Sequence, residues 1–269
     1  MNPKITHIDT ACCLIEIEGF KILTDPTLDE AGKLYHHGFG AISKKTESPI
    51  INKVNLQDVD LILLSHPQHK DNFDLKGREF AKGVPLIIST QRIEKQFKNG
   101  KGLKPWESYE IEFPNTTKRL KVTATPAQHH PNWLPKFISG EVIGFFIETN
   151  QSHETIYISG DTIFFRGINE IVKKLKPITY ALIHVGSAQF RYLTGLGKFT
   201  MDAKGFIETI TKINPKIAIP IHNGGWAHFK ENDDGIKRQS LTAKPEIRQK
   251  IHFLERGKPT ELKLLTTQG

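Results

Sequence analysis

Two histidines, an aspartate and an asparagine are crowded into residues 65–72 (SHPQHKDN). The largely apolar run at residues 59–64 just before them predicts a buried strand. Side chains in a loop that follows a rigid strand can be directed at one point, which is how proteins present imidazole and carboxylate ligands to a metal ion. An HxxH match by itself is weak evidence, because two histidines at this spacing often arise by chance.

The same arrangement, a predicted strand followed by a polar ligand, recurs three more times along the chain. The fragments are residues 125–129 (TPAQH), 159–162 (SGDT) and 219–222 (IPIH). Imidazole and carboxylate groups are the usual ligands of zinc and related ions. Four such fragments predict a metal centre.

The length and composition favour one globular domain spanning residues 1–269. An apolar content of 38% is sufficient for a sizeable core, and composition nowhere shifts enough to mark a linker. The longest apolar runs are far shorter than the roughly 20 residues that span a bilayer. No apolar stretch follows the N-terminus, so neither a membrane segment nor a secretory signal is expected.

Cysteine usage predicts a cytoplasmic setting, and the charge bears on the class of partner. Cys12 and Cys13 are adjacent, where a disulfide would be strained, so we expect reduced, buried strand residues. The net charge of +8 is spread over scattered lysines, without the block of like charges typical of a nucleic-acid footprint. We expect an anionic small-molecule substrate, with nucleic acid and membrane partners disfavoured; the oligomeric state is not predicted.

Hydrophobic periodicity predicts strands in the first half of the chain and alternating strands and helices in the second. A tight turn at Glu18-Gly19 joins the first two strands, residues 26–53 are expected to form a long surface loop, and Thr200 is the expected N-cap of a helix over residues 203–213. Further strands are predicted at residues 84–89, 120–125, 142–147, 155–159, 180–185, 216–221 and 250–254, and further helices at 90–97, 168–175 and 245–249. This pattern predicts sheets sandwiched between helices.

The four ligand fragments (residues 65–72, 125–129, 159–162 and 219–222) resemble the metallo-β-lactamase superfamily in their order along the chain. Residues 23–26 (LTDP) and 225–229 (GWAHF) add to this resemblance. The resemblance extends over nearly the whole chain and is closest to a branch of metal-dependent hydrolases related to ascorbate-phosphate lactonases. It implies an α/β fold, a four-layer αββα sandwich, with a dinuclear metal site at the edges of the sheets. The ligands that it implies are His66, His69, Asp71, Asn72, His129, Asp161 and His222.

The resemblance also assigns roles to these ligands. One metal is expected between the three histidines of the first two fragments and the other between Asp71 and His222, with Asp161 bridging the two. The family's HxHxDH pattern appears here as HxxHxDN. Either His66 reaches over a bulged loop, or Gln68 takes part in its place. Asn72 offers only a carboxamide oxygen, which suits Mn²⁺ better than Zn²⁺, so we expect one or two divalent ions, Zn or Mn.

Several residues near these ligands are candidates for substrate contact or support. The substrate-binding candidates are His130, His184, Trp226 and His228, for which solvent exposure or core packing are the alternatives. His7 and Asp25 are expected to support the ligands from behind. We expect His36, His37, His153 and His252 to lie on the surface or in loops.

The expected reaction is hydrolysis. A divalent ion lowers the pKa of bound water from 15.7 toward about 7, giving a metal-bound hydroxide that cleaves an ester, lactone or phosphoester bond. Asp71 is the expected catalytic residue, orienting the nucleophile and accepting its proton. Two alternatives stay open: a phosphodiesterase acting on nucleotides or nucleic acid, and a non-catalytic metal-binding module.

Overall fold

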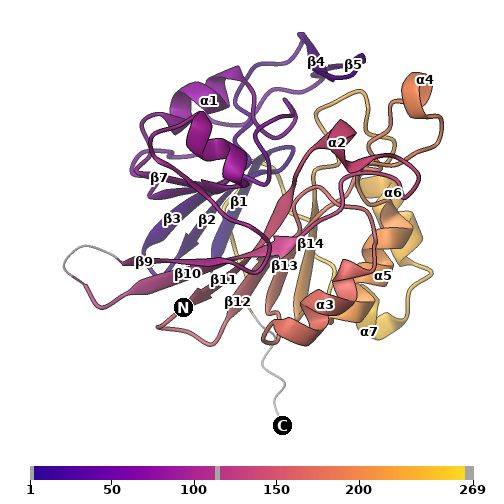
Figure 1. The fold of residues 1–269 in the computed structure, drawn as a ribbon. Coiled ribbons are helices and arrows are strands. Elements are labelled where there is room, and N and C mark those ends of the chain that lie inside the picture. The colour runs from indigo at the N-terminus through magenta and orange to yellow at the C-terminus, as the bar shows by residue number, and fades with distance from the viewer. Residues whose placement is uncertain (1–2, 113–115, 264–269) are drawn as a thin grey trace.

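A computed structural model describes residues 3–112 and 116–263 of the protein, and two main β-sheets form its centre (Figure 1). The seven-stranded sheet has the order β15 (Thr260–Glu261), β1 (Lys4–Asp9), β2 (Cys12–Ile17), β3 (Phe20–Thr24), β6 (Leu61–Leu63), β7 (Leu86–Ser89) and β8 (Gly100–Gly102). The six-stranded sheet has the order β14 (Ile217–Ile221), β13 (Tyr180–His184), β12 (Thr155–Ile158), β11 (Ile143–Thr149), β10 (Arg119–Pro126) and β9 (Ser108–Glu112).

Helices cover the outer faces of both sheets. The 3-10 helix η1 (Gln91–Lys95) and α1 (Leu75–Ala81) lie on the seven-stranded side. On the six-stranded side lie α3 (Gly167–Lys174), α5 (Ala203–Ile213), α6 (Asp233–Ser240) and α7 (Pro245–Arg248) (Figure 1). The short helices α2 (Lys136–Ser139) and α4 (Arg191–Thr194) lie beyond the sheets, near the two-stranded hairpin of β4 (Leu34–Gly38) and β5 (Ala41–Lys44).

Three hydrophobic layers follow from the two-residue period of the strands. In β6, Leu61 and Leu63 point into the core between the two sheets, whereas Ile62 points to the helical side of its sheet. In β13, Leu182 faces the other sheet and Ile183 faces the helices. Three cores separating four layers give the αββα sandwich, so the predicted fold class is confirmed.

Most predicted elements are present, with three corrections. Residues 26–53 contain the β4–β5 hairpin, because alternate residues such as Tyr35 and Ser43 are buried against the body of the protein. The N-cap of α5 is Asp202, whose carboxylate accepts from the amide of Gly205; Thr200 accepts from Ala188 instead. Residues 250–254 form only an isolated bridge from Ile251 to Ala218, not a strand.

Two smaller expectations hold. The turn at Glu18-Gly19 is present, with positive φ at both residues as its two-residue length requires, but it joins β2 to β3 because residues 4–17 form two strands and not one. Cys12 and Cys13 are fully buried and unpaired. Among the described residues, no helix combines the length and the apolar character needed to cross a bilayer.

Candidate metal centre

The predicted ligands gather at one edge of the sandwich because they follow strands whose carboxyl ends meet there. β12, β13 and β14 are parallel neighbours, so Asp161, His184 and His222 come out at the same edge. His66 follows β6 of the facing sheet, and His129 follows β10. The two sheets thus supply ligands from both sides.

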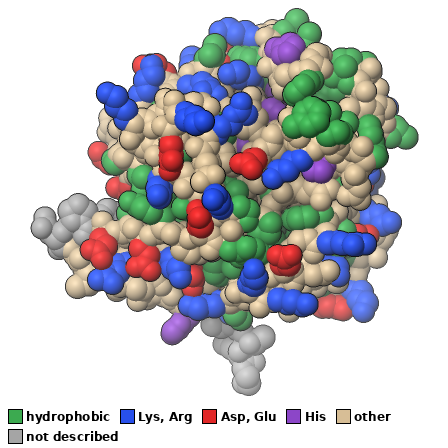
Figure 2. Space-filling model, viewed as in Figure 1, with side chains coloured by type: hydrophobic (Ala, Val, Ile, Leu, Met, Phe, Trp, Pro, Cys, Tyr) green, Lys and Arg blue, Asp and Glu red, His purple; other side chains and the backbone are tan. Residues whose placement is uncertain are grey.

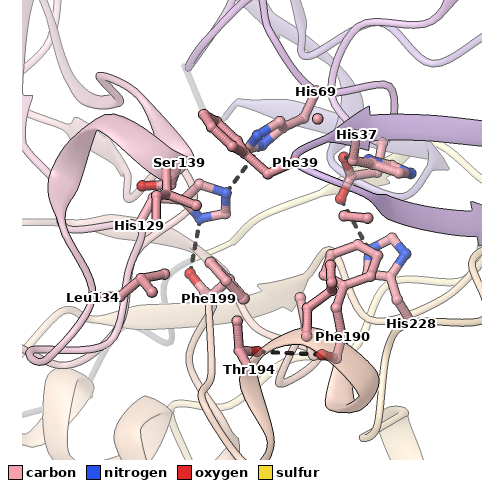
Figure 3. A pocket seen from close by; sticks show the side chains of 16 residues that line it. His37, Phe39, His69, His129, Leu134, Ser139, Phe190, Thr194, Phe199 and His228 are labelled. Atoms are coloured by element: carbon pink, nitrogen blue, oxygen red, sulfur yellow. Dashed lines mark hydrogen bonds and ion pairs between the residues drawn. The ribbon is translucent and has the colours of Figure 1, made fainter.

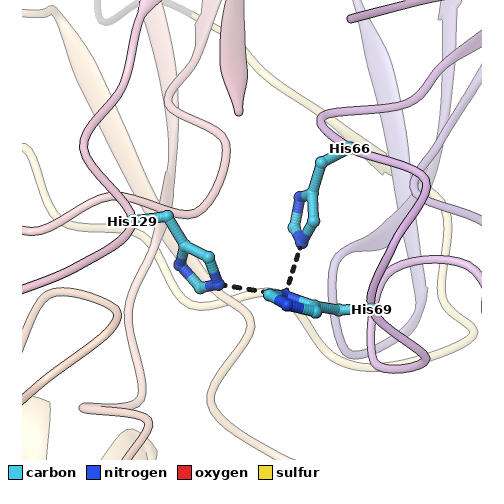
Figure 4. A group of neighbouring side chains, drawn as sticks. All are labelled: His66, His69 and His129. Carbon is cyan, nitrogen blue, oxygen red and sulfur yellow. Dashed lines mark hydrogen bonds between the residues drawn. The ribbon is translucent and has the colours of Figure 1, made fainter. Parts of the chain in front are cut away.

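His66, His69 and His129 converge on one point (Figure 4). Nδ1 of His69 lies 3.0 Å from Nε2 of His66 and 3.1 Å from Nε2 of His129. A single ring nitrogen offers either one N–H or one lone pair, so hydrogen bonding among these imidazoles cannot satisfy all three nitrogens. A cation at their centre would.

Hydrogen bonds behind the rings direct lone pairs toward that point. Ser65 donates its hydroxyl proton to Asp25, so its oxygen accepts from Nδ1–H of His66 at 2.9 Å. Nδ1–H of His129 donates to the carbonyl of Phe199 at 2.8 Å. In both histidines Nε2 is therefore the unprotonated nitrogen, which is the form that binds a metal ion.

Asp161, His184 and His222 form a second, fully buried group. Nδ1 of His184 lies 2.8 Å from Oδ1 of Asp161, and Nε2 of His222 lies 3.3 Å from the same oxygen. The other oxygen of Asp161 lies 3.9 Å from His66 and 3.8 Å from His129. Asp161 therefore lies between the two groups, in the position that the resemblance implies for a bridging carboxylate.

Asp71 lies on the pocket side of this second group and is held by histidines. Its Oδ2 is 3.0 Å from Nε2 of His228 and 3.7 Å from Nε2 of His222, and its Oδ1 is 3.2 Å from Nδ1 of His37. His37 is buried on the hairpin, in contrast with the surface position expected for it. Sequence reasoning missed this contact because no motif spacing links His37 to Asp71, and only the position of the hairpin brings the two side chains together.

The protonation states match those of metal ligands. Burial lowers the pKa of His66 to about 3 and holds the pKa values of His69 and His129 below their usual range. Burial opposes ionisation of Asp71 and Asp161, but the neighbouring histidines, chiefly His37 and His222 respectively, outweigh it and hold both pKa values well below normal. At neutral pH His66, His69 and His129 are therefore neutral, and Asp71 and Asp161 are ionised.

The two residues that break the family's spacing have different surroundings. Gln68 donates its side-chain amide to the carbonyls of Ser139 and Glu141, away from the three histidines, so the geometry favours His66 as the ligand. The amide of Asn72 lies 3.2 Å from Oδ1 of Asp161, and its buried carbonyl oxygen has no hydrogen-bond partner. Asn72 thus orients Asp161 and keeps a free oxygen.

A pocket of about 210 Å³ opens beside the ligands (Figure 3). His69, Asp71, His129 and His228 line it. Of the other substrate-binding candidates, His184 lies beneath the pocket against Asp161, and His130 contacts the carbonyl of Pro131. Trp226 is buried behind His37 and His228, with its ring centroid 5.3 Å from that of His37.

His7 and Asp25 lie behind the ligands. Nε2 of His7 bonds the carbonyl of Thr10, and the same carbonyl accepts from the backbone amide of His222. Asp25 accepts two hydrogen bonds from Ser65, while burial and the nearby Asp161 raise its pKa to about 8.

The donor set fits divalent metal ions. Buried polar atoms without a hydrogen-bond partner include Nε2 of His222 and Oδ2 of Asp161. Unpaired buried polar atoms are costly, and their clustering next to three convergent imidazoles is explained by bound cations that would satisfy them. His66, His69 and His129 would hold one ion, and Asp71 and His222 a second, with Asp161 between them.

Known proteins match both the sequence and the fold. A family model described as "Beta-lactamase superfamily domain" matches residues 21–223. A metal-dependent hydrolase of Nanoarchaeum equitans is 30% identical over 192 residues, covering 69% of this chain and 79% of its own.

Two solved structures share the fold. The isothiocyanate hydrolase from Delia radicum gut bacteria has a TM-score of 0.77 at 22% identity, covering 96% of this chain and 99% of its own. A metallo hydrolase from Ignicoccus hospitalis has a TM-score of 0.68 at 19% identity, covering 98% and 99%. At these identities the likeness concerns the fold alone.

Proposed function

The chain belongs to the β-lactamase superfamily and is a metal-dependent hydrolase, and we propose that it cleaves an ester, lactone or phosphoester bond of a small molecule with one or two zinc or manganese ions. One observation carries this proposal. Two groups of ligands lie on either side of Asp161, and His69, Asp71 and His129 line a pocket beside them. A metal ion buried without access would serve structure rather than hydrolysis.

The bound ions would supply Lewis acidity and a water of lowered pKa. The protein supplies the rest. Asp71 lines the pocket as an ionised carboxylate, and His37 and His228 hold its two oxygens in place. We assign to Asp71 the orientation of the attacking water and the acceptance of its proton.

His129 and Asp161 fix the geometry of this reaction. The bond from Nδ1–H of His129 to Phe199 keeps the Nε2 lone pair directed inward. His184 and Asn72 both donate to Oδ1 of Asp161, which leaves its Oδ2 facing His66 and His129. Removing a residue that hydrogen-bonds to a metal ligand typically lowers metal affinity or activity by 10–100-fold.

The test is metal content together with hydrolysis. Elemental analysis of protein purified without added metal gives the identity and number of ions. We expect His129→Ala and Asp161→Ala to lose stoichiometric metal and all hydrolysis of a panel of esters, lactones and phosphoesters. His153→Ala, an exposed histidine in the turn between β11 and β12, is the matched control and should keep both. Full metal content and activity in both ligand variants would refute the proposal.

A further inference from the structure

The pocket beside the ligands has a polar floor and apolar walls. His37, His69, Asp71, His129 and His228 form the floor. The walls come from three loop regions of the chain that are far apart in sequence: Phe39 of the hairpin, Leu134 and Ile138 around α2, and Phe190, Leu193 and Phe199 around α4 (Figure 3).

None of the described residues that line this pocket is Lys or Arg. An anionic group against the apolar walls would lose its hydration without gaining a partner, which is strongly unfavourable. The net charge of +8 led to the expectation of an anionic substrate, but none of the described basic residues lines this pocket. The walls therefore select against charge.

On the basis of the proposed function of this site, we propose that the substrate carries an uncharged, apolar group of about the size of a phenyl ring, which occupies the space between these walls while the reacting bond faces the metal ligands. The size follows from the volume. An apolar cavity of about 150 Å³ accommodates benzene, and this pocket holds about 210 Å³. A phenyl or branched alkyl group fits, with room for the bond to be cleaved.

The rim of the pocket has the same character. Phe39 and Phe137 are 65% and 71% exposed and contact each other, with ring centroids 6.3 Å apart. Tyr192 of α4 accepts a hydrogen bond from the amide of Ile42 and donates to the carbonyl of Gly40, so α4 is tied to the hairpin. Figure 2 shows hydrophobic side chains gathered at the upper right of this face, where Figure 1 places α4. Apolar surface at the entrance is continuous with the apolar walls, as an apolar group entering the pocket requires.

Ligand binding tests this proposal without relying on turnover. Benzohydroxamic acid and 4-sulfobenzohydroxamic acid are titrated against the metal-loaded protein by ligand-detected NMR, since both carry the same metal-chelating hydroxamate and differ only in a charge on the far side of the ring. We expect benzohydroxamic acid to bind at least tenfold more tightly than its 4-sulfo derivative. Leu193→Arg should reverse that preference, since Leu193 lines the pocket but is 46% exposed, so an arginine there can be accommodated.

Leu241→Arg is the matched control, because Leu241 is a 67% exposed leucine that is not among the residues lining the pocket. It adds the same charge and should leave both affinities unchanged. Equal or tighter binding of 4-sulfobenzohydroxamic acid to the wild type, or no change in Leu193→Arg, would overturn the proposal.

Hydrolysis separates failure of the substrate class from failure of the proposed function. Phenyl acetate and 4-acetoxybenzenesulfonate differ in the same charge. We expect kcat/KM to favour phenyl acetate at least tenfold in the wild type, and the ratio to fall in Leu193→Arg. If the binding preference holds but neither this pair nor the wider panel is hydrolysed, the proposed reaction is wrong and the apolar specificity stands. If the protein is an active hydrolase that prefers the sulfonate, only the apolar specificity is wrong.

Discussion

Nδ1 of His37 lies 3.2 Å from Oδ1 of Asp71, and both side chains are buried. His37 comes from the hairpin of β4 and β5, whereas Asp71 comes from the ligand loop after β6. Together with His228 on the other oxygen, His37 keeps the Asp71 carboxylate ionised and fixed. The hairpin is therefore part of the site's support as well as a wall of its pocket.

His37→Ala should lower kcat/KM by about 10–100-fold, the range found when a residue that supports a metal ligand is removed. His36→Ala is the matched control, because His36 is the neighbouring residue on the same hairpin but is exposed. Steady-state kinetics on both variants, with metal content measured alongside, tests the relationship. Equal activity in the two variants would show that the contact with Asp71 does not matter.

Metal loading should stabilise the protein through Asp161. A ligand that binds only the folded state at 100 times its Kd contributes about 2.7 kcal/mol. Adding zinc or manganese to metal-free wild type should therefore raise Tm clearly, and a chelator should reverse the change. In Asp161→Ala the added metal should leave Tm almost unchanged. An equal rise in that variant would place the ions elsewhere.

The metal-free protein should lose stability as the pH falls below about 6.5. The pKa values of His66, His69, His129 and His228 are depressed in the folded state, mainly by burial, with that of His66 at about 3. Below 6.5 the unfolded chain therefore binds more protons at these residues than the folded one does. The stability that they contribute is present above about 6.5 and is lost toward the folded pKa, by at most about 1.4 kcal/mol per pH unit for each group.

Asp25 acts in the opposite direction, because its raised pKa of about 8 makes the folded state bind a proton that the unfolded state releases. Between pH 5 and 6.5 the loss of stability caused by the four histidines is larger than the gain caused by Asp25. Thermal melts of metal-free protein should thus give a lower Tm at pH 5 than at pH 7. A higher Tm at pH 5 would mean that these histidines are not held neutral.

Gly160→Ala should weaken both folding and metal binding. Gly160 has a φ of +62°, and a Cβ there would lie 2.4 Å from the carbonyl oxygen of Ile143, next to Asp161. We expect a loss on the order of 3 kcal/mol and reduced metal content in the folded fraction. Gly83→Ala, where a Cβ would meet its nearest neighbour at 3.7 Å, should change neither. Denaturant unfolding and elemental analysis of the two variants provide the comparison.

Cys12 and Cys13 should be inert in the native protein. Both are fully buried, and burial raises both thiol pKa values. A thiol reagent such as DTNB should label neither cysteine until the protein is denatured, when it should label both. Rapid labelling of native protein would contradict this burial.

The sequence by itself determined the layers and predicted the candidate ligands, because both depend on local order along the chain. Continuous apolar runs such as β6 and β13 predict strands buried on both faces, whose alternate residues lie in separate cores, and the candidate ligands lie at or just after strand ends. The predicted N-cap Thr200 was wrong, because Asp202 is the residue whose side chain reaches the amide of Gly205.

Tertiary structure alone decided the surroundings of those ligands. Whether His66 or Gln68 faces the site depends on the carbonyls of Ser139 and Glu141, which belong to a distant segment. The burial of His37 and the apolar walls of the pocket depend in the same way on the hairpin meeting α2 and α4. Such contacts join loops far apart in sequence, and no local periodicity encodes them.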